Sequence, residues 1–148
     1  EHLWSDIKQI DENFWKNRYE SIRDFEKHLA RNGTTIIKIF LHISKKEQKK
    51  RFLDRINEED KNWKFALGDI KERLLWEQYQ QAYQQAIEET SKDYAPWYIL
   101  PADDKWFTRV AACQIIIDTL EKMNLKYPQL SDEEKAALYE AKKSLENE

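Results

Sequence analysis

The pattern of apolar and polar positions predicts a helix followed by a strand in the first third of the chain. Apolar residues recur at helical spacing over about 12–31, at Trp15, Tyr19, Ile22 and Leu29. Gly33 then supplies the left-handed position that commonly ends a helix. The run 35–43, TIIKIFLHI, is β-branched and almost continuously apolar, which favours a strand buried on both faces, as in a parallel sheet.

A helical hairpin is predicted directly after this strand. Ser44 and Glu47 have the spacing of a capping box, which indicates the start of a helix over about 45–57. Residues 58–62 are polar and are expected to form a turn. A long helix is then predicted over about 69–90, because apolar residues again recur three and four positions apart.

A second strand and another helix follow the hairpin. Pro96 favours an extended entry, and residues 97–100 have the composition of a short strand. Asp103 or Asp104 can cap the next helix, which is predicted over about 105–123. The middle of this helix is apolar almost all round, so we expect it to be covered on more than one side.

The last helix, about 131–146, begins at a second capping box formed by Ser131 and Glu134. The order of the elements implies two strands joined by a helical crossover, and such strands pair in parallel. Parallel sheets are normally larger than two strands and covered on both faces. We therefore expect residues 1–148 to form a single partial domain of a helix-rich α/β fold, with further strands outside this chain.

Composition narrows the possible functions. The net charge of -3 argues against a general nucleic-acid binder, and the longest apolar run, 110–117, is too short to span a membrane. The single cysteine, Cys113, cannot form an intrachain disulfide, which favours a reducing, cytoplasmic location. With only two glycines, the chain contains neither a GxxxxGK[ST] nor a GxGxxG phosphate-binding loop.

Five cations on and around the predicted hairpin form the first candidate site. These hairpin cations are Arg51, Arg55, Lys61, Lys64 and Arg73. Arginine binds phosphate through two parallel N–H groups, and two of the arginines lie one helical turn apart. From the residues alone, however, a solvated face is favoured, in which the cations pair with neighbouring acidic residues. Those acidic residues are Asp54, Glu58, Glu59 and Glu72.

Four further side chains have two interpretations each. Trp63 and Phe65 could stack on a base, but packing the hairpin against the body of the protein is favoured. Asp69 could contact a metal or a lysine, although an N-cap of the long helix is the simpler role. Asp103 follows a strand end, where ligands bind in open α/β sheets, yet capping is again preferred to a contact with a base. The dispersed histidines show no metal-ligand spacing, so no metal site is predicted within the chain.

Three stretches resemble the C-terminal half of the polyphosphate kinase 2 family, and the resemblance covers about 15–125. The stretches read FWKNRYESIRDFEKHLARNGTTIIKIFLHISKKEQKKRFLDR, KNWKFALGDIKERLLWEQY and TSKDYAPWYILPADDKWFTR. The resemblance implies a P-loop kinase-like α/β/α sandwich with a helical lid. It also implies transfer of a phosphoryl group between polyphosphate and AMP or ADP, with Mg²⁺.

The same resemblance places the family's Walker A and Walker B motifs upstream of the matching region, and neither motif is present here. It implies that the hairpin segment, defined here as about 45–75, is a lid in which at least two hairpin cations bind phosphate. The main Mg²⁺ ligands would then lie outside this chain, which alone is expected to be inactive. A homo-oligomer is expected. The alternative is a non-catalytic helical interaction module that self-associates through exposed apolar surface.

Overall fold

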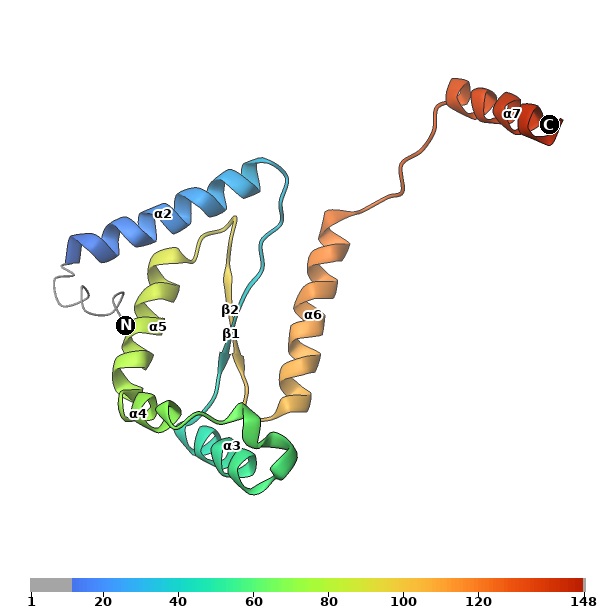
Figure 1. The fold of residues 1–148 in the computed structure, drawn as a ribbon. Coiled ribbons are helices and arrows are strands. Elements are labelled where there is room, and N and C mark those ends of the chain that lie inside the picture. Colours follow the sequence, from blue (N-terminus) through green and yellow to red (C-terminus); the bar gives the residue numbers. More distant parts are fainter. Residues whose placement is uncertain (1–11, 148) are drawn as a thin grey trace. The chain divides into compact units, whose positions relative to one another are not determined.

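The computed structural model describes residues 12–147, which divide into two compact units between Gln114 and Ile115. Figure 1 shows the elements in chain order. They are α2 (Glu12–Arg31), β1 (Lys38–His42), α3 (Lys45–Asn57), the 3₁₀ helix η2 (Glu59–Lys64), α4 (Gly68–Leu74), α5 (Trp76–Thr90), β2 (Trp97–Pro101), α6 (Lys105–Met123) and α7 (Asp132–Glu146). The first unit contains both strands. A single partial domain stays a prediction.

The two strands form a parallel sheet, as the sequence predicts. They pair in register from Lys38 beside Trp97 to His42 beside Pro101. Burial of the first strand on both faces, however, is not observed in the part of the chain that the structure describes. The side chain of Leu41 in β1 is 55% exposed, because no described element covers it.

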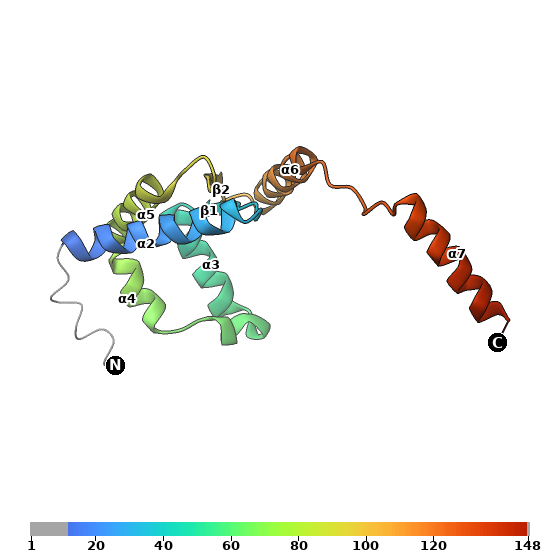
Figure 2. The ribbon, with the colours of Figure 1, turned by 90° about the horizontal axis from the view of Figure 1, so that it is seen from above.

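A buried ion pair joins the strands to the helices on one face of the sheet. The Lys38 ammonium on β1 donates to both carboxylate oxygens of Glu26 on α2, at 2.8 and 2.7 Å. It also donates to the Thr90 carbonyl at the end of α5, at 2.8 Å, and lies 5.3 Å from the Trp97 ring of β2. One side chain thus links four elements, and α2 packs against α5 beside it (Figures 1 and 2).

The hairpin segment has two helical arms, α3 and α4, with η2 at its tip (Figure 2). The single long helix predicted over 69–90 is wrong, because α4 ends at Leu74 and α5 begins at Trp76. Leu75 between them has φ -91° and ψ 21°, and its N–H donates to the Glu72 carbonyl at 3.0 Å. This tight turn interrupts the helical hydrogen bonds, so α4 and α5 are separate helices.

The two predicted capping boxes differ in the structure. At the start of α7, Ser131 and Glu134 exchange both hydrogen bonds of a complete box. At the start of α3, the Ser44 hydroxyl accepts from the Glu47 N–H at 3.0 Å. The Glu47 carboxylate does not complete this box, since it accepts from Arg51 Nε at 2.8 Å instead.

Much apolar surface remains open in the first unit. Among the described residues, no large side chain is fully buried. Ile99 of β2 is 56% exposed, and Trp106 near the start of α6 is 74% exposed. Completion of the sheet by a larger body stays a prediction. Within 12–147, every helix is too short or too polar to cross a membrane.

Candidate functional site

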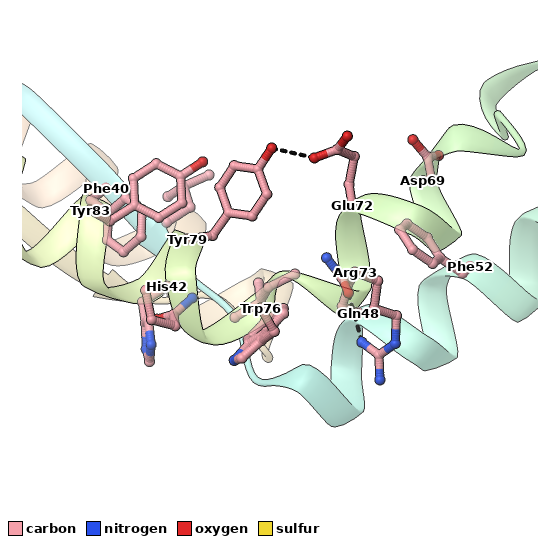
Figure 3. Close-up of a pocket in the computed structure, with 13 residues that line it drawn as sticks. Phe40, His42, Gln48, Phe52, Asp69, Glu72, Arg73, Trp76, Tyr79 and Tyr83 are labelled. Atoms are coloured by element: carbon pink, nitrogen blue, oxygen red, sulfur yellow. Dashed lines mark hydrogen bonds between the residues drawn. The ribbon is translucent and has the colours of Figure 1, made fainter. Parts of the chain in front are cut away.

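A pocket of about 300 Å³ opens at the carboxyl end of β1, between that strand and helices α3, α4 and α5 (Figure 3). Ligands of open α/β folds bind at this end of parallel strands. The lining residues are Phe40, Leu41, His42, Ile43, Gln48, Phe52, Asp69, Glu72, Arg73, Trp76, Tyr79, Gln80 and Tyr83.

Aromatic rings form one wall of the pocket. The Phe40 ring of β1 lies 4.8 Å, centroid to centroid, from the Tyr83 ring of α5. The Tyr79 ring, one turn earlier on α5, lies 6.2 Å from Tyr83. Trp76 is half-buried at the start of α5, directly after the turn that separates α4 from α5. One face of α5 therefore presents an indole ring and two phenols at one opening.

Two carboxylates from α4 lie on the polar side of the pocket. The Tyr79 hydroxyl donates to Glu72 at 2.5 Å, and this hydrogen bond raises the pKa of the phenol above its ordinary value (Figure 3). Asp69 accepts from the Ala66 N–H at 3.3 Å. The predicted N-cap role of Asp69 is wrong, because Leu67 occupies the N-cap position and the helix starts one residue before Asp69.

Arg73 is the one hairpin cation that lines this pocket. Its Nη1 donates to the Lys45 carbonyl at 2.8 Å. It also donates to Gln48 Oε1 at 2.6 Å (Figure 3). Both acceptors belong to the first turn of α3, which follows β1. Arg73 therefore fastens α4 to the start of α3 and holds a guanidinium beside the pocket.

Arg51 makes a comparable contact with the loop after β2. Its Nη2 donates to the Ala102 carbonyl at 2.5 Å, while its Nε pairs with Glu47. The side chain is 25% exposed. Arg51 therefore links α3 to the second strand end and does not enter the pocket.

Asp103 and Asp104 have separate roles in that loop. Asp104 caps α6, because its Oδ1 accepts from the Trp106 and Phe107 N–H groups at 2.8 and 3.0 Å. Asp103 instead accepts from the Ser44 N–H at 2.7 Å, across the two strand ends. Hydrogen bonds from the Ser44 backbone and side chain lower the pKa of Asp103. Of the two aspartates, Asp104 is therefore the cap, and Asp103 connects the loop to the start of α3.

The remaining hairpin cations lie outside the pocket. Arg55 lies over the Phe52 ring, with its guanidinium carbon 5.8 Å from the centroid. Lys61 pairs with Glu58, and hydrogen bonding to that carboxylate raises the pKa of the lysine. Lys64 lies over the Trp63 ring at 5.0 Å. The structure thus does not bring the five hairpin cations together around one point.

The two aromatic residues of the hairpin tip behave differently. Phe65 packs edge-on against Phe52 of α3, with centroids 5.8 Å apart, so it holds the tip against an arm of the hairpin itself, and packing against the body of the protein stays a prediction. Trp63 is 79% exposed, and its indole N–H donates to the Asp60 carbonyl at 3.0 Å. Packing of Trp63 against the body of the protein is therefore not observed in the described part of the chain, because most of this side chain is exposed.

The pocket itself was not predicted from the sequence. Its residues on α4 and α5 have the spacing of one helical face, and the signal was therefore available. They are Asp69, Glu72, Trp76, Tyr79 and Tyr83. Such a stripe is also typical of core packing, so the spacing alone does not distinguish a buried face from the wall of a pocket.

A metal ion has no evident site in this part of the chain. Within 12–147, no group of three or more His, Cys, Asp or Glu side chains could hold a metal ion. Asp69 and Glu72 are the acidic groups of the pocket. Two carboxylates without a third ligand do not form a dedicated Mg²⁺ cage, so we assign no chemical step here to a metal.

A small parallel sheet with covering helices and a helical hairpin defines a helix-rich α/β fold of the P-loop kinase-like class. The family model for polyphosphate kinase 2 matches residues 7–128. The chain belongs to the polyphosphate kinase 2 family. A crystal structure of polyphosphate kinase 2 from Arthrobacter aurescens TC1 has a TM-score of 0.79 and 41% identity, over 88% of this chain and 47% of that chain.

Curated relatives differ in how much of their length this chain covers. The chain is 48% identical to the AMP/ADP-polyphosphate phosphotransferase of Meiothermus ruber, over 81% of this chain and 45% of the relative. It is 46% identical to the ADP-polyphosphate phosphotransferase of Rhodopseudomonas palustris, over 93% and 48%. The chain thus spans about half the length of these two enzymes. An uncharacterized protein in the chlN 3' region of Leptolyngbya boryana is 52% identical, over 90% of this chain and 98% of that protein.

Proposed function

We propose that this chain is the C-terminal part of a polyphosphate-dependent nucleotide phosphotransferase, and that its hairpin segment closes over phosphate groups. The observation that carries the proposal is the family match over 7–128, which includes the whole hairpin segment. Relatives that are 46–48% identical to this chain over the matched residues are named as ADP- or AMP/ADP-polyphosphate phosphotransferases. The substrates proposed here are therefore inorganic polyphosphate and AMP or ADP.

Phosphoryl transfer suits the chemistry of the hairpin. The reaction needs positive charge over the phosphate oxygens and a water-poor site, and it needs little covalent help from the protein. An arginine has five N–H donors. In the hydrogen bonds described above, Arg73 uses only Nη1, and Arg51 uses Nε and Nη2. Both guanidinium groups thus keep donors with which to bind phosphate oxygens.

The other three hairpin cations are proposed as phosphate ligands on the moving part of the lid. Arg55, Lys61 and Lys64 make no hydrogen bond from the side chain to a strand-end loop among the described residues. A phosphate chain can displace a cation from a ring face or an exposed carboxylate at small free-energy cost, because surface pairs contribute only about 0–1 kcal/mol. Closure on substrate would bring these cations toward Arg73.

Several finer features belong to the same proposal. Enzymes of this family generally need a divalent metal, and we propose Mg²⁺, held mainly by residues outside this chain. Trp63 and Asp69 would be secondary contacts of the closed lid, and Asp103 would hold the two strand-end loops in position. A homo-oligomer and a cytoplasmic location stay predictions.

A turnover assay tests the proposal. Polyphosphate-driven phosphorylation of AMP and ADP is measured for this chain and for a chimera in which the preceding residues of the Meiothermus ruber relative are joined to it. We expect magnesium-dependent turnover by the chimera and none by the chain alone. Robust turnover by the chain alone would contradict the requirement for the missing motifs. A chimera that folds, yet does not transfer phosphate, would contradict the proposed activity.

A second candidate function rests on the open apolar surface. Ile99 and Trp106 are more than half exposed, and Leu138, Tyr139 and Leu145 of α7 are exposed at 56%, 67% and 69%. A non-catalytic module that self-associates through such surface is the alternative. It predicts association without any gain of turnover in the chimera, and this outcome separates it from the enzyme.

A further inference from the structure

One amide side chain of η2 contacts three backbone carbonyls. The Asn62 Nδ2 donates to the Arg55 and Ile56 carbonyls at 2.8 and 2.9 Å. It also donates to the Glu58 carbonyl at 3.2 Å. Because all three neighbours are acceptors, the atom between them is the amide nitrogen, which shares its two hydrogens among the three. Asn62 thus joins η2 to the end of α3.

The contacted carbonyls lie where α3 runs out of its own hydrogen-bond donors. Carbonyls in the last turn of an α-helix lack an intrahelical N–H partner. The Glu58 N–H still bonds to the Asp54 carbonyl at 3.1 Å, and the chain then leaves the helix. The next two carbonyls, those of Arg55 and Ile56, receive the Asn62 amide instead. The side chain therefore caps the end of α3 from the following element.

This cap holds together the backbone of the three cations that are proposed as phosphate ligands on the moving part of the lid. Arg55 contributes one of the contacted carbonyls, and its guanidinium lies over a ring of the same helix. Lys61 and Lys64 belong to η2, as Asn62 does. The amide therefore fixes the backbone that carries Arg55 to the backbone that carries the two lysines.

The tip of the hairpin segment, defined here as 52–65, forms a small body of its own. Phe52 and Phe65 pack edge-on at its base. Its ion pair and its two cation–ring contacts also join residues of the tip. The preceding turns of α3, by contrast, are fastened to α4 by Arg73 and to the loop after β2 by Arg51. The tip thus continues from a fixed part of α3 and carries its three cations as one group.

A group of cations whose backbone is already fixed binds a polyanion at lower cost. Every loop or long side chain that must be ordered on binding takes free energy from the complex. When the tip is held by Asn62, the phosphate oxygens have to order only the ends of three side chains. When the tip is loose, they have to order its backbone as well.

We propose that Asn62 is a positioning residue of the lid, whose amide keeps Arg55, Lys61 and Lys64 in one preformed group for the phosphate chain. Asn62 has no charge and acts through these three cations. This inference rests on the proposed function, because that function supplies polyphosphate.

Asn62→Leu tests the inference, because leucine has nearly the shape of asparagine and no charge, but cannot donate a hydrogen bond. Asn57→Leu is the matched control in the last residue of α3, whose side chain makes none of the hydrogen bonds described for this hairpin. Inorganic tripolyphosphate is titrated into the whole chain in a calorimeter. We expect Asn62→Leu to raise the Kd about tenfold, and Asn57→Leu to change it by less than about twofold.

A second readout separates positioning from a general loss of structure. In the chimera, Asn62→Leu should raise the KM for polyphosphate about tenfold and leave kcat and the KM for ADP nearly unchanged, because uniform binding of the polyphosphate is lost. A damaged fold would instead lower kcat and raise the KM of both substrates. That result would contradict a positioning role.

The titration also distinguishes failure of this inference from failure of the proposed function. If the unchanged chain binds tripolyphosphate and the Asn62 and Asn57 variants bind it equally well, the phosphate lid stands and the role of Asn62 is wrong. If the unchanged chain binds no tripolyphosphate, the phosphate-closing lid itself is wrong, and the positioning role is contradicted with it.

Discussion

At the scale of single residues, Lys38 carries an unusually large share of the contacts between elements. Its ammonium bonds to Glu26 and to the Thr90 carbonyl, and the Lys38 and Glu26 side chains are only 11% and 12% exposed. A charge so far removed from water is tolerated because each hydrogen-bonding group has a partner.

Lys38→Met should therefore destabilise the protein by about 3 kcal/mol, because it leaves the Glu26 carboxylate buried without its cation. Urea unfolding measures the change in the free energy of unfolding. Arg23→Met is the matched control, since Arg23 of α2 forms a more exposed pair with Glu89 of α5, at 3.4 Å. The control should lose less than about 1 kcal/mol. Similar losses in the two variants would contradict a special role of Lys38.

Asp103 gives a pH-dependent prediction at the same scale. Hydrogen bonds from Ser44 lower its folded-state pKa below the unfolded value of about 3.9, so the bonds favour folding only while Asp103 is ionised. The stabilisation is complete above the unfolded pKa and is lost as pH falls through the folded pKa. Unfolding free energies should show a constant gap between wild type and Asp103→Asn above about pH 5, and a closing gap below about pH 4. A gap that widens in acid would contradict this linkage.

At the scale of elements, the turn at Leu75 decides the shape of the pocket. A continuous helix would carry the stripe of Asp69, Glu72 and Trp76 along one straight face. The turn instead makes α4 a separate arm that Arg73 fastens to α3. The position of α4 thus depends on hydrogen bonds from Arg73 to α3, a contact between distant parts of the sequence.

Hydrogen exchange tests the break directly. The first N–H groups of a helix have no helical carbonyl to bond, so the amides of 76–78 should exchange with solvent much faster than those of 84–86 in the middle of α5. NMR measures both sets in one sample. Equal protection of the two sets would indicate a continuous helix and would remove the basis for the pocket.

The helices whose limits depend on local signals could be predicted from the sequence. α2, α3 and α6 have the predicted limits, because periodicity and end signals lie within a few residues of each helix. The break at Leu75 could not be predicted, since LLWEQY contains good helix formers and the hydrogen bonds from Arg73 come from 25 to 28 residues away. The sequence identifies the hairpin cations as a charged group. It does not identify the partner of each cation, because those partners depend on the folded structure.

At the scale of the whole molecule, exposed apolar surface is the main feature of the described chain. Leu41 and Ile99 are each more than half exposed on the two strands. An open strand edge with such neighbours tends to pair with another chain. The expectation that further strands lie outside this chain came from the sequence through the rule that parallel sheets are larger than two strands.

We therefore predict that the chain alone self-associates. Light scattering at several concentrations should give a mean mass that rises above the 18.0 kDa of one chain. In the chimera, the added residues should cover the strands, and the dependence of mass on concentration should weaken. A monomer at every concentration, with no such chimera effect, would contradict the role given to the open sheet.

The hairpin cations provide the most direct test of the phosphate-closing lid. Arg55 and Lys64 are the best positions to change, because each side chain lies over an aromatic ring and makes no described hydrogen bond to a backbone carbonyl. Truncation of these two side chains should therefore leave the fold intact. In the active chimera, Arg55→Ala with Lys64→Ala should lower kcat/KM for polyphosphate at least about tenfold, since each charged hydrogen bond to phosphate contributes about 1.5–3 kcal/mol.

Lys49→Ala with Lys50→Ala removes the same charge from an exposed part of α3 and serves as the matched control. The measurement is the ratio of kcat/KM for polyphosphate between the two double variants. A lid that closes on phosphate predicts that the control keeps nearly the activity of the unchanged chimera while the Arg55 and Lys64 variant loses most of it. Equal kcat/KM values in the two double variants would contradict the lid.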